Sequence, residues 1–431
     1  MRNYFYSLFF NNRREFSLVD LFVAISFVSL LYAGVQLAAY APEYIAAPTI
    51  SDSPSALPVY AFFSIMRMLA AYALSVVFSL IYGRIAAYNQ RAEKILIPIL
   101  DVLQSVPILS FLPVVILSLR AILPQGIAAE LGSVVLIFTS QVWNMTFAWY
   151  QSLTTIPNDL QEAAAINNLN RWQRFKNLEF PFGTISFIWN SMMSWAGGWF
   201  FLMAAEIFTV GNKDFRLPGL GSFLHEASDK GNYTAILWGV ATLILIIVVL
   251  DQVIWRPLLA WSDKFKFEMT TGDDPPTSWF YSVMINSNIV YSIKEKILFP
   301  VGRKIDRFFS TRSKPVVTDE KTKSASIIGK VVTYLFGGAI LFGLFSAVMM
   351  LVEVKLPDWG EILTGVFATF LRVCVALIIA FLWTIPVGVL IGTNRKAARF
   401  LQPLIQIFAA IPATALFPIV LLFVISLPFG V

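Results

Sequence analysis

A run of charged, amide and aromatic side chains at residues 162–181, EAAAINNLNRWQRFKNLEFP, has the residue types and spacing of a protein-binding surface. The segments on its two sides, 131–150 and 187–210, are apolar and long enough to cross a lipid bilayer. A charged run between two such segments lies in water, where a soluble partner can bind it. Its chemistry is therefore recognition through hydrogen bonds and ion pairs. We call residues 158–181 the island.

The spacing within the island predicts a helix, a turn and a second helix. The first helix is expected over 160–166, with Asn158 and Asp159 as capping residues. A turn is then favoured by three residues that tolerate the left-handed conformation, Asn167, Asn168 and Asn170. In the second helix one apolar face is formed by residues at i, i+3 and i+6, namely Trp172, Phe175 and Leu178. Pro181 is expected to end this helix, because proline interrupts helical hydrogen bonding.

Catalytic and metal-binding chemistry has little support in the rest of the chain. The only cysteine, Cys374, lies in an apolar segment and the only histidine, His225, lies outside one, which excludes a disulfide framework and a Cys/His zinc cluster. A phosphate-binding loop of the form GxxxxGK[ST] does not occur. We therefore predict that the chain is not an enzyme and binds no cofactor or metal itself.

The composition predicts a membrane protein. With 57% hydrophobic and 13% charged residues among 431, the chain is too apolar for a soluble globular protein. Several segments reach about 20 apolar residues, the length that crosses about 30 Å of hydrocarbon. The predicted fold class is all-α, a polytopic transmembrane helical bundle. Its predicted spans are 20–40, 61–82, 95–119, 131–150, 187–210, 234–255, 331–352, 363–391 and 401–427.

The basic residues predict the orientation of these spans, because cytoplasmic loops carry an excess of Lys and Arg. They gather before the first span, after the second, in the island and after the eighth; they are Arg2, Arg13, Arg14, Arg84, Arg91, Lys94, Arg171, Arg174, Lys176, Arg395, Lys396 and Arg399. The loop 42–59 contains two acids and no basic residue. The N-terminus and the island are therefore expected in the cytoplasm, and the net charge of +6 indicates topology, with no nucleic-acid partner.

The island resembles the EAA loop of binding-protein-dependent ABC importer permeases. That pattern contains Glu-Ala-Ala, a glycine six residues after the Glu, and a leucine and a proline at fixed distances; the matching residues are Glu162, Ala163, Ala164, Leu178 and Pro181. Two positions depart from it, since Asn168 replaces the glycine and Phe180 replaces a leucine. Asn is the best substitute for glycine at a left-handed turn. The WQRF run is similar to the nitrate, sulfonate and taurine branch of these permeases.

The resemblance implies a multi-pass permease of the cell inner membrane that moves a small solute by alternating access. Its implied partners are separate ATPase subunits, which use ATP and Mg²⁺, and an extracytoplasmic solute-binding protein. The branch suggests a small anion such as nitrate, a sulfonate or taurine. The implied ATPase-coupling residues are Glu162, Ala163, Ala164, Asn168, Trp172, Phe175, Leu178 and Pro181. A secondary transporter built from repeated helical units is the alternative, but such a protein needs coupling-ion acids near the membrane midplane, which this chain almost lacks.

Three charged residues inside predicted spans are candidates for the translocation pathway: Glu206, Arg67 and Arg372. A charge within a span is costly and is usually tied to function. For Glu206 the alternatives are a gating role, a structural hydrogen bond to a neighbouring helix, or a position near the outer end where water reaches it. The two arginines either line an anion route or snorkel from a span end, and for both the structural interpretation is favoured.

The chain repeats itself across a charged segment at 260–327, which is expected to be a cytoplasmic linker. A shift of 305 residues pairs three prolines and several other residues: Arg67 with Arg372, Gly83 with Gly388, Asn89 with Asn394, Ala92 with Ala397, Pro98 with Pro403, Pro107 with Pro412, and Pro113 with Pro418. The predicted domains are therefore a first permease domain of about six spans at 1–259 and a partial second one of three spans at 328–431. We expect a complete gene product to carry the remainder of the second copy, because a half-bundle exposes helix faces made for protein contact.

Overall fold

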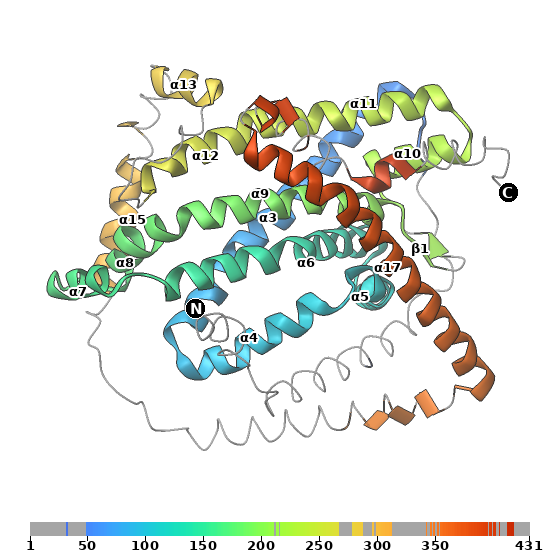
Figure 1. Cartoon of the computed structure of the whole chain (residues 1–431), viewed down its shortest axis with the longest axis horizontal. Helices are drawn as coiled ribbons and strands as arrows, with labels where there is room; N and C mark the ends of the chain where they lie inside the picture. The colour runs from blue at the N-terminus through green and yellow to red at the C-terminus, as the bar shows by residue number, and fades with distance from the viewer. Residues whose placement is uncertain are drawn as a thin grey trace. The chain divides into compact units, whose positions relative to one another are not determined.

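The computed structural model describes residues 49–210, 213–214, 216–266, 278–287, 299–312 and 354–394, with short stretches near them (Figure 1). Within these residues the fold is helical except for one antiparallel pair of two-residue strands, β1 (Thr209–Val210) and β2 (Lys213–Asp214). The predicted all-α fold class is confirmed. The chain forms two compact units: 42–88 with 123–322 and 400–431, which we call the bundle unit, and 1–41 with 89–122 and 323–399.

Three long helices form the centre of the bundle unit: α3 (Leu57–Tyr88), α6 (Gln125–Thr154) and α9 (Phe180–Glu206). α6 packs along both α3 and α9, and Figure 1 shows α6 beside α9 with α3 passing behind them. Small side chains line the buried face of α3 and let the helices approach closely. At Gly83, for example, an added Cβ would lie 2.9 Å from Trp149 Cδ1.

The remaining helices of the bundle unit extend this centre. The short helix η1 (Pro54–Ala56) leads into α3, and α10 (Leu220–Asp229) packs against α3, α9 and α11 (Tyr233–Leu250). The axis of α11 continues through a π-helical turn, η3 (Asp251–Trp255), into α12 (Arg256–Ser262) and η4 (Asp263–Phe265). Two further helices follow, α13 (Trp279–Asn286) and α15 (Phe299–Arg312).

Aromatic rings fill the junction of these helices. Tyr72, Trp195 and Trp255 meet edge to face, with ring centroids 5.5 to 5.8 Å apart. Trp199 is also buried, at 1% exposure. Edge-to-face contacts of this kind stabilise aromatic cores. Trp195 and Trp199 of α9 therefore serve packing in the core of the bundle unit.

Four described helical segments are long and apolar enough to cross a membrane: 54–88, 126–154, 233–265 and 357–393. They coincide with the predicted spans 61–82, 131–150, 234–255 and 363–391. The predicted span 187–210 corresponds to α9, which ends at Glu206. The predicted spans 20–40, 331–352 and 401–427 lie mostly outside the described residues.

The predicted continuous span 95–119 is wrong. Two helices occupy it, α4 (Gln90–Ser105) and α5 (Ile108–Ile122), separated at Val106 and Pro107. Val106 has extended backbone angles, φ −79° and ψ 127°. The physical reason is that a proline ring disfavours the helical conformation of the residue before it.

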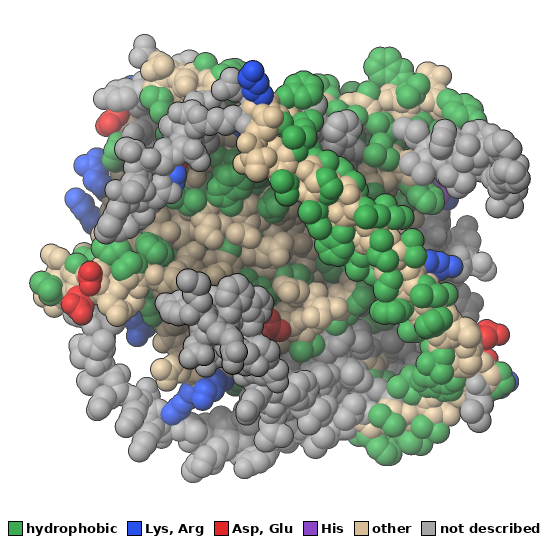
Figure 2. Space-filling model, viewed as in Figure 1, with side chains coloured by type: hydrophobic (Ala, Val, Ile, Leu, Met, Phe, Trp, Pro, Cys, Tyr) green, Lys and Arg blue, Asp and Glu red, His purple; other side chains and the backbone are tan. Residues whose placement is uncertain are grey.

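The other unit contains α4, α5 and α17 (Leu356–Thr393). The side chains of α17 are exposed along most of its length, and hydrophobic groups cover the face of it seen in Figure 2. A helix that is apolar on all sides is typical of membrane spans. The division into permease domains at 260–327 stays a prediction, because much of that segment lies outside the described residues.

The sequence repeat has a counterpart in local structure. Asn89 and Asn394 are both extended, with φ of −132° and −120°, and each side chain accepts hydrogen bonds from the backbone N–H groups two and three residues later at 3.0 to 3.2 Å. Pro107 and Pro412 are likewise followed by the same turn, in which the N–H three residues on donates to the proline carbonyl at 3.0 Å. The same 305-residue offset therefore relates conformations as well as residue types.

Candidate functional site

The first helix of the island is α7 (Asn158–Ile166). Its N-cap residue is Pro157, and no side chain caps it, so the predicted capping by Asn158 and Asp159 is wrong. The extended Pro157 starts the helix directly, which places these two residues inside its first turn. There the negative charge of Asp159 still favours the helix N-terminus through the macrodipole.

The turn after α7 is built on Asn168, as predicted. Asn168 has a positive φ of 49°, in the left-handed region where asparagine is tolerated. Backbone hydrogen bonds to the carbonyls of Ala163 and Ala164 close the end of the helix. The position that holds glycine in the EAA pattern therefore has the conformation that glycine favours.

The second helix begins with a capping box. Asn170 Oδ1 accepts from the Gln173 backbone N–H at 2.8 Å, and Gln173 Oε1 accepts from the Asn170 N–H at 3.0 Å. This helix, α8 (Arg171–Arg174), passes through a π-helical turn, η2 (Phe175–Glu179), directly into α9. Pro181 lies in the first turn of α9, so its predicted role as the end of the second helix is wrong. The wider π turn before it changes the hydrogen-bond register where proline lacks a donor.

The apolar face predicted on the second helix lies against the protein. Phe175 and Leu178 pack on a buried cluster formed by α6 and the start of α9, whose members are Met145, Trp149, Leu153, Ile156 and Phe187. Trp172 stacks on Phe309 of α15 with ring centroids 4.8 Å apart. These three residues therefore fix the island in place and leave little of this face for a partner.

The surface that a partner can reach is on α7. Glu162, Ala163 and Asn168 are exposed, and Ile166 is 79% exposed. Ala164, by contrast, is buried on the opposite side of the helix. An exposed aliphatic side chain ringed by a carboxylate and amides is suited to docking on another protein.

Glu179 is a site residue that sequence reasoning missed. Its side chain is fully buried, and it accepts from Arg84 of α3 at 2.7 and 3.3 Å. Arg174 Nε lies 3.4 Å from Oε1 of Glu179. Arg84 also donates to the Arg171 carbonyl at 3.0 Å. We call Arg84, Arg174 and Glu179 the Arg84 cluster. The partners are 95 positions apart along the chain, so no local spacing could indicate the pair.

Arg67 and Glu206, predicted separately as pathway residues, form one buried ion pair with a nitrogen–oxygen distance of 2.9 Å. Glu206 also accepts from the Ser64 hydroxyl at 2.6 Å and from the Gly221 N–H at 2.7 Å. Arg67 donates on its other side to Glu130 of α6, at 2.6 and 2.7 Å. We call Arg67, Glu130 and Glu206 the Arg67 cluster. Glu130 was not predicted, and its side chain is 46% exposed.

This cluster anchors the loop between α9 and α10. Arg67 donates to the Pro218 carbonyl at 2.9 Å, and the Ser64 hydroxyl accepts from the Leu220 N–H at 3.0 Å. A Cβ at Gly219 would overlap the Glu206 carboxylate, so glycine is needed there for close approach. Each charge is compensated by several partners, which is the condition under which burial is tolerated. The geometry favours the structural alternative for Glu206. Arg372, the third candidate, is exposed on α17 in the other unit.

A polar network joins the chain just before α3 to the turn between α10 and α11. Asp52 accepts from Lys230 Nζ at 3.0 Å and from Asn232 Nδ2 at 2.9 Å. Lys230 also pairs with Glu226 at 3.1 Å, and Glu226 with Arg216 at 2.8 Å. The hydrogen bonds from Asn232 and Lys230 lower the pKa of Asp52.

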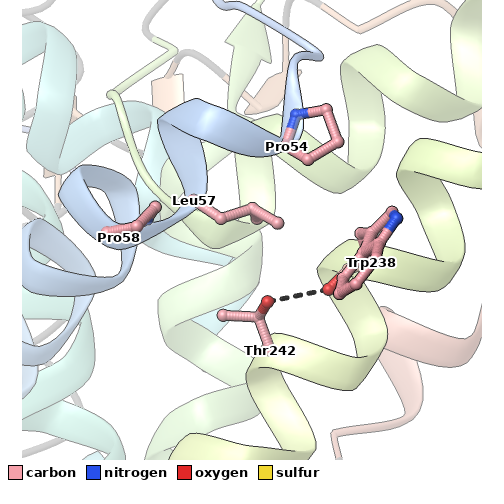
Figure 3. A pocket seen from close by; sticks show the side chains of 5 residues that line it. All are labelled: Pro54, Leu57, Pro58, Trp238 and Thr242. Atoms are coloured by element: carbon pink, nitrogen blue, oxygen red, sulfur yellow. Dashed lines mark hydrogen bonds between the residues drawn. The ribbon is translucent and has the colours of Figure 1, made fainter.

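A shallow pocket between the start of α3 and α11 is apolar. Figure 3 shows its lining by Pro54, Leu57, Pro58, Trp238 and Thr242, with the Thr242 hydroxyl donating to the Trp238 carbonyl at 2.8 Å. The pocket has a volume of about 280 Å³. None of the five residues that line it is charged, so it has no group that would select a charged solute. In the described part of the chain, moreover, no group of three or more His, Cys, Asp or Glu side chains is arranged to bind a metal ion.

Comparison with known proteins identifies relatives of this sequence. Residues 75–254 match the family model for the inner membrane component of binding-protein-dependent transport systems. The nitrate import permease protein NrtB of Leptolyngbya laminosa is 23% identical over 192 residues, which cover 44% of this chain and 64% of that protein. NrtB of Synechocystis is 22% identical over 199 residues, 46% of this chain and 67% of that protein.

A third relative aligns with more of the chain. The trimethylamine N-oxide transport system permease protein TmoV of Pelagibacter ubique is 23% identical over 399 residues, which cover 83% of this chain and 52% of that protein. The chain thus spans between about half and two thirds of the length of the relatives it matches.

Proposed function

We propose that this chain is the membrane-spanning subunit of an ATP-driven ABC importer and that a separate ATPase binds its island; the match of residues 75–254 to the inner membrane component of binding-protein-dependent transport systems supports this. The chain is a transport permease rather than an enzyme, and a multi-pass inner-membrane protein. ATP and Mg²⁺ act in the partner subunit.

The observation that carries the proposal is the shape of the island. α7 presents an exposed surface around Glu162 and Ile166, while α8 and η2 are fastened to the bundle by Phe175, Leu178 and Glu179. A projecting helix on a rigid base transmits force instead of bending under it. A soluble partner that moves α7 therefore moves the helices below it.

The path of that movement runs into the bundle by two routes. η2 continues without a break into α9, and Glu179 ties the same turn to Arg84 of α3. Displacement of the island by nucleotide-driven closure of the ATPase would then tilt both helices and alternate the access of a central path. This is coupling between two distant sites through an element with two positions.

The names of the relatives and the distribution of charge indicate which solute is carried and where a solute-binding protein would dock. The names of the relatives support a small polar solute, with a nitrate-like anion as our choice. An extracytoplasmic binding protein would dock near the network of Asp52 and Lys230, at the opposite end of α3 from the island. The distribution of Lys and Arg supports a cytoplasmic N-terminus and island.

Orientation is testable by cysteine labelling in intact cells, with Cys374 replaced by alanine. An impermeant thiol reagent is expected to modify a cysteine at position 52 and to leave one at position 168 unmodified. Modification at 168 alone, or at both positions, contradicts the proposed topology.

The docking is testable with the complex reconstituted in nanodiscs with its ATPase and binding protein. Glu162→Lys reverses the charge on the exposed face of α7 and is expected to lower solute-stimulated ATP hydrolysis at least tenfold, as for a charged contact at a protein interface. Glu295→Lys, the same change at an exposed residue of the charged segment 260–327, is the matched control. Equal stimulation in wild type and Glu162→Lys rejects the docking surface.

A further inference from the structure

We infer that α15 is a docking helix that holds the second half of the island, so that the predicted linker is itself part of the coupling device; the inference rests on the proposed function. α15 comes more than a hundred residues after the island in the sequence. Nothing in the family pattern of the island calls for it.

The contact is centred on Asp306. Its two carboxylate oxygens accept from two residues one helical turn apart in the island: Trp172 Nε1 at 3.0 Å and Lys176 Nζ at 2.5 Å. These two hydrogen bonds lower the pKa of Asp306, with that from Lys176 the larger cause. A carboxylate shared by two donors fixes both the distance and the rotation of α15 against α8.

Phe309 adds an apolar contact to the same face. It follows Asp306 by three residues and therefore lies beside it on α15. Its ring stacks on Trp172, and a chain of ring contacts continues from there through Phe175 to Trp149 in α6, with centroid distances of 4.8, 5.8 and 6.2 Å. The linker helix is thus joined through the island to the packed centre of the bundle.

This arrangement supports the island without covering its docking surface. α15 contacts Trp172 and Lys176, while Glu162 and Ile166 on α7 stay exposed. On its other side the same turn of the island is held by Glu179. α8 is therefore held from two directions, and the position of α7 depends on both.

Adsorption of α15 to anionic lipid is the competing interpretation, because the helix carries exposed basic residues such as Arg303 and Lys304. The pairing of Asp306, the only acid of α15, with the island favours docking. A helix that served only to bind anionic headgroups would have no use for this carboxylate.

A charge exchange tests the inference. Lys176→Asp and Asp306→Lys each place two like charges in contact, and each is expected to lower solute-stimulated ATP hydrolysis by about three- to tenfold, as for a lost charge-assisted hydrogen bond. The double variant restores the ion pair with reversed polarity, but a lysine at position 306 cannot accept from Trp172 Nε1. It should therefore recover more than half of the stimulation lost in either single variant, without reaching the wild-type level. Lys304→Asp, an equal charge reversal on an exposed position of α15, is the control and should change little.

Amide hydrogen exchange measures the docking of α15 on the island independently of ATP hydrolysis. Amide hydrogen exchange of residues 170–176 is expected to rise in each single variant and to return in the double variant. If Glu162→Lys abolishes coupling while the Asp306 and Lys176 variants change neither readout, the proposed function stands and this inference falls. If Glu162→Lys has no effect, but amide hydrogen exchange rises in the single variants and falls again in the double variant, then α15 does dock on the island and the proposed function fails. Effects that appear only with anionic lipid and are not recovered in the double variant overturn docking in favour of lipid binding.

Discussion

The two arginines of α3 bind the two ends of α9 in different ways. Arg67 is 4% exposed and lies between Glu206, which is fully buried, and Glu130. Arg84 is 32% exposed and reaches a buried Glu179 at the start of α9. The Arg67 cluster binds the loop between α9 and α10. The Arg84 cluster instead binds residues of the island. The same pair of residue types therefore anchors a loop at one end of the helix, which we call the fixed point, and attaches the island at the other, which we call the island joint.

The largest effect is expected at the fixed point. Arg67→Ala leaves Glu206 buried without its cation and should lower the free energy of unfolding by ~3–5 kcal/mol, the cost of breaking a buried ion pair. Chemical denaturation in detergent measures the change. Arg84→Ala is the comparison variant and should cost less, ~1–3 kcal/mol, because Arg174 remains beside Glu179 and water reaches the arginine side of the pair. Equal losses at the two sites contradict the distinction between the clusters.

The loop that the Arg67 cluster anchors provides the next test. In Gly219→Ala the new methyl group overlaps the Glu206 carboxylate, which should cost ~1–3 kcal/mol of stability, as overpacking does. Gly197→Ala is the matched control, because a Cβ there meets no atom within 4 Å. Thermal unfolding of the two variants side by side decides the point. A Gly219→Ala protein as stable as Gly197→Ala means that the carboxylate is not held where the structure has it.

At the island joint the proposed function predicts a larger effect on coupling than on stability. Glu179→Gln keeps the shape of the side chain but removes the charge that holds Arg84 and Arg174, at a cost of about 1–2 kcal/mol. Solute-stimulated ATP hydrolysis should nevertheless fall severalfold while basal ATP hydrolysis is kept. Loss of stability without loss of stimulation would make this cluster a second fixed point.

The smallest effect concerns the exposed network near the start of α3. The pKa of Asp52 is lowered from 3.8 and that of Lys230 is raised from 10.5, each chiefly by hydrogen bonds to its partners. The contribution of Asp52 to the stability of the folded protein is present above the pKa of Asp52 in the unfolded chain. It is lost as the pH falls through the lowered pKa of the folded protein. The contribution of Lys230 is present below its unfolded pKa and is lost only as the pH rises through the raised one.

The network should therefore be unchanged between about pH 5 and pH 9. Spin labels at positions 53 and 233 report the distance between the two segments, and Tyr233 is 62% exposed. Separation of the labels between pH 7 and pH 5 contradicts this assignment, and Lys230→Met serves as the separated reference.

Several features of this molecule could be predicted from sequence because their cause is local. The membrane-spanning lengths of α3, α6, α11 and α17 follow from runs of apolar residues, and the left-handed Asn168 follows from the chemistry of asparagine. The break at Pro107 has a local cause too, because a proline disfavours the helical conformation of the residue before it, here Val106. A run of apolar residues alone, as at 95–119, does not reveal such a break.

The ion pairs could not be predicted, because their cause is not local. Arg67 and Glu130, or Arg84 and Glu179, meet only after the helices pack, and nothing near either residue in sequence marks its partner. The inward direction of Phe175 and Leu178 has the same origin. Their spacing correctly gave a shared face, but whether that face turns to the bundle or to a partner is decided by the buried cluster around Trp149.

The central claim is that a partner ATPase binds the exposed face of α7 while the aromatic face of the island stays against the bundle. A photo-reactive amino acid at position 166 or at position 178, in the complex within native membranes, tests it most directly. The account predicts a cross-link to the ATPase from 166 and none from 178. A cross-link from 178 in the absence of one from 166 would contradict it.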